Sequence, residues 1–273
     1  MRIAFFSDIH GNAIALEAVL ADIAAHCVAD ACDVDEYWVL GDLVAVGPQP
    51  IAVLERVTAL PNVRFVRGNT DRYVTVGDRP PPYLDDVLAD PARLPAFAEV
   101  AQTMAWTQGA LMATGWLPFF DALPIEQRLT LPDGTHLLGV HGSPGTDGGR
   151  GLRPDYDDEF LHQQVANCGA DLVIVGHTHW PMNRRLGGVH AVNLGSVSNP
   201  QVPDRSAWYA ILDADNGGYD LRHHAAAYDN AAVIATLTDV RHPAPAFIAR
   251  HMRGEFARDW PLPPVVRNVM RGV

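Results

Sequence analysis

Five short segments of this chain place Asp, Asn or His beside a glycine or a turn, after apolar runs typical of β-strands. The segments are Ser7–Asn12, Gly41–Val44, Gly68–Asp71, His141–Pro144 and Gly176–His179. Carboxylate, amide and imidazole groups bind hard to borderline divalent metal ions. A neighbouring glycine lets the backbone pass close to a bound group. The pattern therefore predicts a metal site assembled from distant parts of the chain.

The spacing and charge of these residues favour two ions and an anionic substrate. Asp8 and His10 are two residues apart, as are His177 and His179, so on extended segments each pair points the same way. Asp42 supplies a carboxylate able to bridge two ions. Two divalent ions, two aspartates and a bridging hydroxide leave a net charge of about +1, which attracts a phosphate group. Such ions also lower the pKa of bound water toward ~7.

The order of elements in the first 70 residues predicts a parallel sheet covered by helices. Apolar runs predict strands over 2–7, 37–40 and 63–66, and helical spacing predicts helices over 12–26 and 50–59. In such sheets, binding sites gather at the carboxyl ends of the strands. Asp8, Asp42 and Asn69 all fall at those ends.

The rest of the chain predicts a helical insertion and a second sheet. Residues 72–121 break the alternation and contain a predicted helix over 95–113, which either caps the site or packs on the sheet. A hairpin is expected over 125–140, a helix over 155–168 and a buried strand over 172–175. Residues 189–194 and 207–212 are expected to extend the second sheet, followed by a helical and then proline-rich tail from 228.

Composition limits the class of protein and its partners. The 273 residues are 48% hydrophobic and 19% charged, typical of one soluble globular domain. The formal net charge of −12 disfavours extended nucleic acid as a partner. We expect no signal peptide and no membrane span, hence a cytoplasmic protein whose three cysteines stay reduced. The oligomeric state stays open.

The five ordered motifs resemble those of the calcineurin-like metallophosphoesterase superfamily, especially its small bacterial and archaeal branch of YfcE-type phosphodiesterases. The resemblance covers residues 1 to about 205, through Asn193–Val197. It implies an α/β fold, a four-layer α/β/β/α sandwich with two central mixed sheets, and two divalent ions (Mn, Fe, Zn, Co or Ni, with Mn favoured). It implies a first ion on Asp8, His10 and His179, a second on Asn69, His141 and His177, and Asp42 as the bridge.

One departure from the family pattern affects the expected substrates. Many relatives have His after the Asn of the third motif, where this chain has Thr70. A threonine hydroxyl cannot replace a general acid, whose help is typically worth ~10²–10⁴ in rate. We therefore expect a phosphodiesterase or nucleotide pyrophosphohydrolase acting on small substrates with good leaving groups, such as dinucleoside polyphosphates. Asn69 and Asp71 are the expected catalytic residues.

Three residues near the motifs are candidates for binding substrate. Arg72 is a possible phosphate contact or a surface cation, Trp180 a base-stacking or a packing residue, and Asn12 a polar contact. The alternatives to a small-molecule enzyme are a phosphoserine or phosphothreonine protein phosphatase, a nuclease, and a non-catalytic protein-binding scaffold on the same fold. The intact set of seven ligands argues against the scaffold, and the acidic charge argues against the nuclease.

Overall fold

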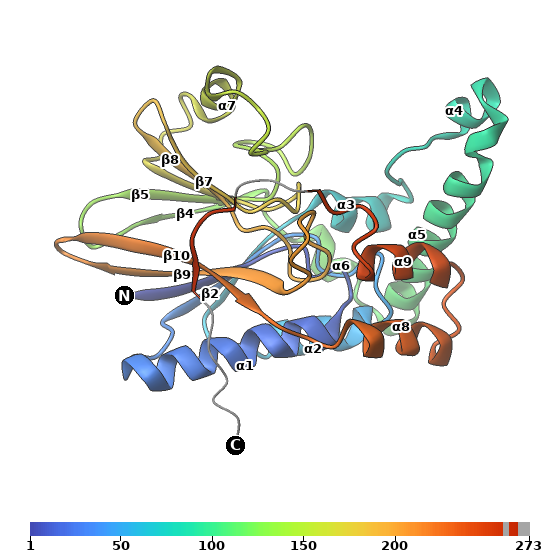
Figure 1. The fold of residues 1–273 in the computed structure, drawn as a ribbon, viewed down its shortest axis with the longest axis horizontal. Helices are drawn as coiled ribbons and strands as arrows, with labels where there is room; N and C mark the ends of the chain where they lie inside the picture. Colours follow the sequence, from blue (N-terminus) through green and yellow to red (C-terminus); the bar gives the residue numbers. More distant parts are fainter. Residues whose placement is uncertain (259–261, 267–273) are drawn as a thin grey trace.

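The β-strands of the computed structural model, which describes residues 1–258 and 262–266, form two mixed sheets that lie face to face (Figure 1). The first sheet has the order β11-β10-β9-β1-β2-β3. On one side of this sheet β1, β2 and β3 run parallel, with β3 at the edge, and β9 joins β1 in the antiparallel direction. The strands are β1 (Arg2–Phe6), β2 (Glu36–Leu40), β3 (Val63–Val66), β9 (Ala207–Asp215), β10 (Gly218–Ala226) and β11 (Val265–Val266).

The second sheet has the order β4-β5-β6-β8-β7, with β5, β6 and β8 parallel and an antiparallel strand at each edge. Its strands are β4 (Glu126–Thr130), β5 (His136–Val140), β6 (Leu172–Val175), β7 (Met182–Leu186) and β8 (Val189–Asn193).

Helices cover both outer faces of the pair of sheets. In Figure 1, α1 and α2 lie below the sheets and α7 lies above them. The helices are α1 (Ala13–Asp30), α2 (Pro50–Thr58), α3 (Asn69–Val76), α4 (Leu84–Ala89), α5 (Leu94–Thr114), α6 (Leu117–Asp121), α7 (Asp158–Val165), α8 (Asn230–Asp239) and α9 (Pro245–Met252), with a 3₁₀ turn, η1, over Pro91–Arg93.

The apolar residues of β1 show why the layers form. Ile3 and Phe5 face the second sheet and pack in a core with Leu137 and Ile174, whereas Phe6 faces α1 on the other side. Successive strand residues point to opposite faces, so a strand that is apolar throughout is buried on both. A third core lies between the second sheet and α7. The predicted four-layer α/β/β/α architecture is confirmed.

The local predictions match most elements, but one strand was placed in the wrong sheet. Residues 207–212 begin β9, which pairs with β1 of the first sheet and does not extend the second. The sequence reading also missed β7, β10 and α3. The error has a physical cause: a strand's apolar pattern shows that it is buried, whereas its neighbours are chosen by contacts between distant segments.

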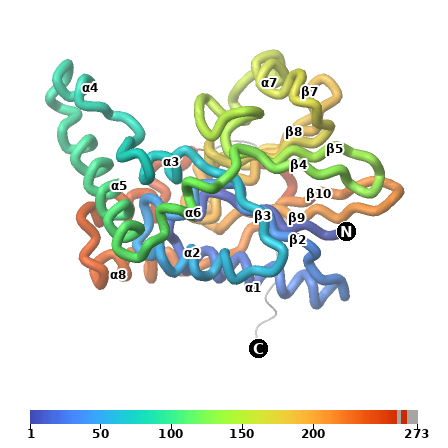
Figure 2. Tube along the Cα trace, turned by 180° about the vertical axis from the view of Figure 1, so that it is seen from behind, coloured from blue at the N-terminus to red at the C-terminus, as the bar shows by residue number. Residues whose placement is uncertain are grey.

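The insertion over 72–121 is helical, and the helix predicted over 95–113 is α5. This helix packs against α2 and α3, and Met104 and Leu111 join the core beneath the first sheet. Seen from behind in Figure 2, α4 and α5 project at the end of the molecule away from the hairpins. Among the helices of the described residues, none is long and apolar enough to cross a membrane.

Candidate metal centre

The predicted ligands follow strand ends of both sheets and meet where those ends converge. Asp8, Asp42 and Asn69 come shortly after the adjacent parallel strands β1, β2 and β3. His141 and His177 follow the adjacent parallel strands β5 and β6 of the second sheet. Because parallel strands end at the same edge of a sheet, two stacked edges bring these polar residues together.

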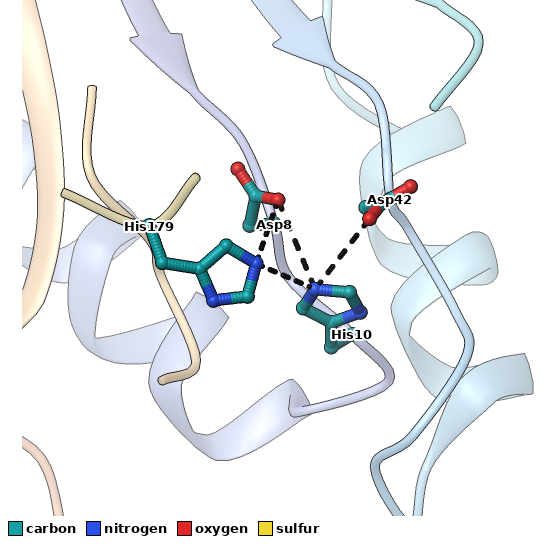
Figure 3. Close-up of side chains that lie close together, drawn as sticks. All are labelled: Asp8, His10, Asp42 and His179. Carbon is teal, nitrogen blue, oxygen red and sulfur yellow. Dashed lines mark hydrogen bonds and ion pairs between the residues drawn. The ribbon is translucent and has the colours of Figure 1, made fainter. Parts of the chain in front are cut away.

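Four of the ligands form a tight cluster, shown in Figure 3. One ligand atom each from Asp8, His10, Asp42 and His179 lies within 4.8 Å of all the others. The Nε2 atom of His179 is 3.0 Å from Oδ1 of Asp8 and 3.1 Å from Nε2 of His10. This group contains the first predicted ligand set and the predicted bridging carboxylate.

The remaining three ligands lie together beside this cluster. Oδ1 of Asn69 is 2.7 Å from Nδ1 of His177 and 3.2 Å from Nε2 of His141. Asp42 faces both groups: its Oδ2 is 3.6 Å from Nε2 of His10, and its Oδ1 is 3.3 Å from Nε2 of His141. The structure therefore brings all seven predicted residues together, with Asp42 between the two sets.

Hydrogen bonds at the Nδ1 atoms of three histidine rings determine which ring nitrogen is free to bind an ion. Nδ1 of His10, His141 and His179 lies 2.9, 2.7 and 3.0 Å from the carbonyl oxygens of Ala45, Leu40 and Asn199. A carbonyl only accepts, so each Nδ1 carries the proton and, in the neutral ring, Nε2 carries a lone pair. This orientation of the ring by a backbone carbonyl is typical of metal-bound histidines.

The cluster needs a positive charge at its centre. The Nε2 atoms of His10 and His179 face each other at 3.1 Å, and two lone pairs at that distance repel unless a proton or a metal ion lies between the rings. Oδ1 of Asp8 is fully buried and, while His179 is neutral, has no hydrogen-bond donor among the described residues, because the Nε2 atom 3.0 Å away then carries a lone pair. A buried carboxylate oxygen without a donor is costly, and coordination of a cation removes that cost. The donor set therefore fits metal ions.

The pKa shifts of the predicted ligands also indicate that the cluster needs positive charge. Burial opposes protonation of His141, but the carboxylates of Asp42 and Asp8 outweigh it and raise its pKa to about 10. Burial also opposes protonation of His179, and Asp8 raises its pKa despite this. Burial alone would raise the pKa of Asp42, yet the nearby His141 and His10 hold it well below its usual range. Without metal ions, protons on the histidines balance the aspartates.

The ligand loops are not extended, which corrects one expectation. Asp8, His10, Asp42, His177 and His179 all have positive φ angles, between 49° and 69°, in the left-handed region. His177 and His179 consequently diverge: His179 faces Asp8, whereas His177 faces Asn69. Asp8 and His10 stay together in one cluster. Strained backbone of this kind is concentrated at functional sites.

Asp71 holds the backbone of the site in place. Its Oδ2 accepts hydrogen bonds from the N–H groups of Asp42 and Gly68, at 2.8 and 2.9 Å, and its Oδ1 accepts one from Leu43 at 2.9 Å. Burial and the neighbouring Asp42 raise its pKa to about 7. With both oxygens occupied by amides, Asp71 acts on the ligand loops and not on a reacting atom.

Of the predicted substrate residues, Asn12 is wrongly assigned. It is fully buried, and its Oδ1 accepts from the N–H of Ala15 to cap α1 while its Nδ2 donates to Ser198. A helix cap of this kind has no polar atom left for a substrate. The error arose because a capping Asn and a substrate-binding Asn look alike in a sequence.

Arg72 and Trp180 lie near the site with other partners. The Nε of Arg72 donates to Asp147 at 3.0 Å, and Asp147 also pairs with Arg67. Trp180 is 5% exposed, and the guanidinium of Arg153 lies over its ring at 4.5 Å. Both residues thus lie at the rim of the site, each already in contact with a charged neighbour.

The C-terminal part of the chain also reaches the site, which the sequence did not reveal. Nδ1 of His251, on α9, lies 3.4 Å from Nδ2 of Asn199, whose carbonyl holds His179. Burial, together with His179 and His10, lowers the pKa of His251 to about 3. A surface pocket next to His177 and His179 includes Gln201 and Arg258 in its lining. No motif signals these residues, because their place depends on how the chain folds back.

Comparison with known proteins agrees with this geometry. Residues 1–217 match the family model for the calcineurin-like phosphoesterase superfamily domain. The chain is 30% identical over 229 residues to the uncharacterized protein MJ0912 of Methanocaldococcus jannaschii, covering 77% of this chain and 82% of that one. It is 29% identical over 226 residues to the phosphodiesterase YfcE of Escherichia coli, covering 79% and 89%. A metallophosphoesterase structure from Sphaerobacter thermophilus superposes with a TM-score of 0.68 at 28% identity, covering 93% and 99%.

The match to the family model spans most of the chain and contains all seven of the clustered residues. This protein therefore belongs to the calcineurin-like phosphoesterase superfamily and is a metal-dependent hydrolase of phosphoester bonds.

Proposed function

We propose that this enzyme is a binuclear phosphodiesterase or nucleotide pyrophosphohydrolase that acts on small substrates with good leaving groups. The observation that carries the proposal is the position of Asp42, whose two oxygens face different histidines, His10 at 3.6 Å and His141 at 3.3 Å. A carboxylate that serves two ligand sets at once is the arrangement expected of a bridge between two ions.

The proposed roles follow from the two clusters. Asp8, His10 and His179 hold one ion, Asn69, His141 and His177 hold the other, and Asp42 serves both. When bound, two divalent ions, with Mn favoured, lower the pKa of water and neutralise the charge of the phosphoryl group. The protein contributes fixed ligand orientation, through the backbone carbonyls behind three of the rings and the brace provided by Asp71.

Thr70 supports the preference for good leaving groups. Its N–H donates to Oδ1 of Asp42 at 2.9 Å, and its hydroxyl is buried without a hydrogen-bond partner among the described residues. No titratable group stands at this position to protonate a leaving oxygen. A leaving group that is already a weak base, such as an aryl oxide or a phosphate chain, needs no such proton.

The test measures the metal content of the purified protein and its rate of hydrolysis of bis(p-nitrophenyl) phosphate. We expect the purified protein to bind two equivalents of Mn²⁺ and to hydrolyse this diester. Asp42→Asn should retain at most one equivalent and lose on the order of 10³ in kcat, because the neutral amide cannot bridge two cations. Asp213→Asn, which removes a carboxylate paired with Arg2 at the opposite edge of the sheet, is the matched control. Full activity and two ions in Asp42→Asn would place the site elsewhere.

A further inference from the structure

A pocket of about 630 Å³ opens beside the metal centre and shares two residues with it. His177 and His179 form part of its wall, so a group held at the metal centre extends directly into it. Its lining is completed by Gly149, Arg150, Arg153, Tyr156, Thr178, Trp180, Gln201 and Arg258. The insertion over 72–121 contributes none of these described residues. The pocket is therefore built from the second sheet's loops and the C-terminal segment.

The pocket is rich in positive charge, although the whole chain carries a net charge of −12. Among the described residues, three arginines line it and no Asp or Glu does. Arg153 is paired with Asp155 through two hydrogen bonds of 2.9 and 2.6 Å. Arg150 and Arg258 are exposed, and within the described part of the chain neither forms an ion pair. Two guanidinium groups that form no ion pair with any described residue thus line the pocket that leads from the predicted ligands.

Aromatic rings hold two of these guanidinium groups in place. Arg150 lies over Tyr156 at 5.2 Å and over Phe160 at 4.8 Å, and Arg153 lies over Trp180 at 4.5 Å. A guanidinium stacked on a ring can still direct its N–H donors at an anion and loses less side-chain freedom on binding. This applies to Arg150, whereas Asp155 already occupies the fork of Arg153. The planar fork matches two oxygens of a phosphate group.

Arg258 is attached to the metal centre through the backbone. Its N–H donates to the carbonyl of Gln201 at 3.1 Å, and the N–H of Gln201 donates to the carbonyl of His179 at 2.9 Å. Two hydrogen bonds therefore fix its position relative to a metal ligand. Arg258 lies outside the residues 1–217 that match the family model, so this contact comes from the C-terminal part of the chain.

We propose that this pocket binds the distal phosphates of a substrate that contains two or more linked phosphates, such as a nucleoside or dinucleoside polyphosphate. The proposal rests on the proposed function and narrows its substrates to compounds with linked phosphates. A substrate with one phosphate fills the metal centre alone, whereas a phosphate chain reaches Arg150 and Arg258. Such a chain is also a good leaving group, which agrees with the missing acid at Thr70.

The reaction is the addition of water across one P–O–P bond. The oxygen of water bonds to the phosphorus held next to His177 and His179, and the bond from that phosphorus to the bridging oxygen breaks. The bridging oxygen leaves with the distal phosphates, which the arginines stabilise as an anion. The two protons of water pass to the products or to solvent, and no redox partner is needed.

The experiment compares two substrates, bis(p-nitrophenyl) phosphate and diadenosine tetraphosphate, with Mn²⁺ in excess. Arg150→Gln, Arg258→Gln and the double variant are measured beside the wild type. We expect the ratio of kcat/KM for the tetraphosphate to that for the diester to fall about 10-fold in each single variant and further in the double variant, since each loses a charged hydrogen bond to phosphate. Arg222→Gln, which removes an exposed guanidinium at the opposite edge of the sheet, should leave the ratio unchanged.

The outcomes separate this inference from the function on which it rests. A ratio that is unchanged in the double variant, or a wild type that hydrolyses the diester but not the tetraphosphate, overturns the pocket assignment and leaves the phosphoesterase intact. A wild type that binds Mn²⁺ and hydrolyses neither substrate overturns the proposed function itself. Circular dichroism of the variants excludes unfolding as the cause of a lower ratio.

Discussion

At the scale of single residues, the metal centre is defined by hydrogen-bond acceptors, both nitrogen and oxygen atoms, that face one another. His10 and His179 point their Nε2 atoms at each other, and Oδ1 of Asp8 has no donor among the described residues unless Nε2 of His179 carries a proton. Each ring is fixed by a backbone carbonyl behind it, so the rings cannot turn to relieve the contact without losing a hydrogen bond. Bringing these acceptors together lowers the stability of the fold unless a positive charge lies among them.

We predict that metal binding releases protons. In the ion-free protein the pKa of His141 is raised to about 10, so this ring is charged at pH 7.5, and Asp8 raises the pKa of His179 as well. A ring must be neutral to bind an ion, so at least the proton of His141 leaves on binding, and the affinity increases as the pH rises toward the pKa of His141. Isothermal titration calorimetry of Mn²⁺ binding in two buffers with different heats of ionisation measures the number of protons released. Identical heats in both buffers would contradict the prediction, and His136→Gln, at an exposed histidine, serves as the control.

At the scale of elements, the site depends on how closely the strand-end loops approach one another. A side chain at Gly68, which precedes α3, would place its Cβ 2.1 Å from Oδ1 of Asp42, far inside contact distance. The loop after β3 therefore sets the position of the carboxylate that follows β2. Glycine at this position is a requirement of packing between loops, in addition to any role in turning the chain.

Gly68→Ala should consequently disrupt the metal centre. We expect the methyl group to displace Asp42, to lower the bound metal below two equivalents and to reduce kcat for bis(p-nitrophenyl) phosphate at least ~100-fold, because a shift of about 1 Å at a reacting group has effects of that size. Gly109→Ala is the matched control, since a Cβ there meets no atom within 4 Å and alanine favours its helix, α5. Equal metal content in the two variants would show that the loop yields without moving the carboxylate.

At the scale of the whole molecule, buried histidines away from the metal centre connect folding to pH. His223, on β10, is 1% exposed, and its Nε2 donates to the carbonyl of Asn193 at 2.8 Å. Burial lowers its pKa to about 4, whereas an unfolded histidine titrates near 6.5. The unfolded chain therefore binds the proton first as the pH falls, and folding is penalised progressively between about pH 6.5 and 4.

We predict that the ion-free protein loses stability in this interval partly through His223. Urea unfolding with EDTA at pH 7.5 and 5.0 gives the change in the free energy of unfolding. The change should be smaller by roughly 2 kcal/mol in His223→Gln, whose amide can still donate to Asn193 but does not titrate. If the wild type and the variant lose stability equally, the pH dependence arises from other groups.

Individual residues show what the sequence was able to predict. The strand-end positions of Asp8, Asp42 and Asn69 followed from apolar periodicity, whereas the seven-ligand set and the four-layer arrangement were implied by the family resemblance of the motifs. Asn12 failed, because the same side chain serves equally well as a helix cap. The strand over 207–212 was recognised as a strand and assigned to the wrong sheet.

What the sequence determined by itself is the chemistry of the ligands and the local elements that carry them, since side-chain type and periodicity are properties of short segments. Only the tertiary structure decided that β9 lies beside β1 and that the ligand loops are left-handed. It alone brought Arg258 to a pocket beside His179. These features depend on contacts between segments far apart in the chain, and such contacts leave no local pattern to read.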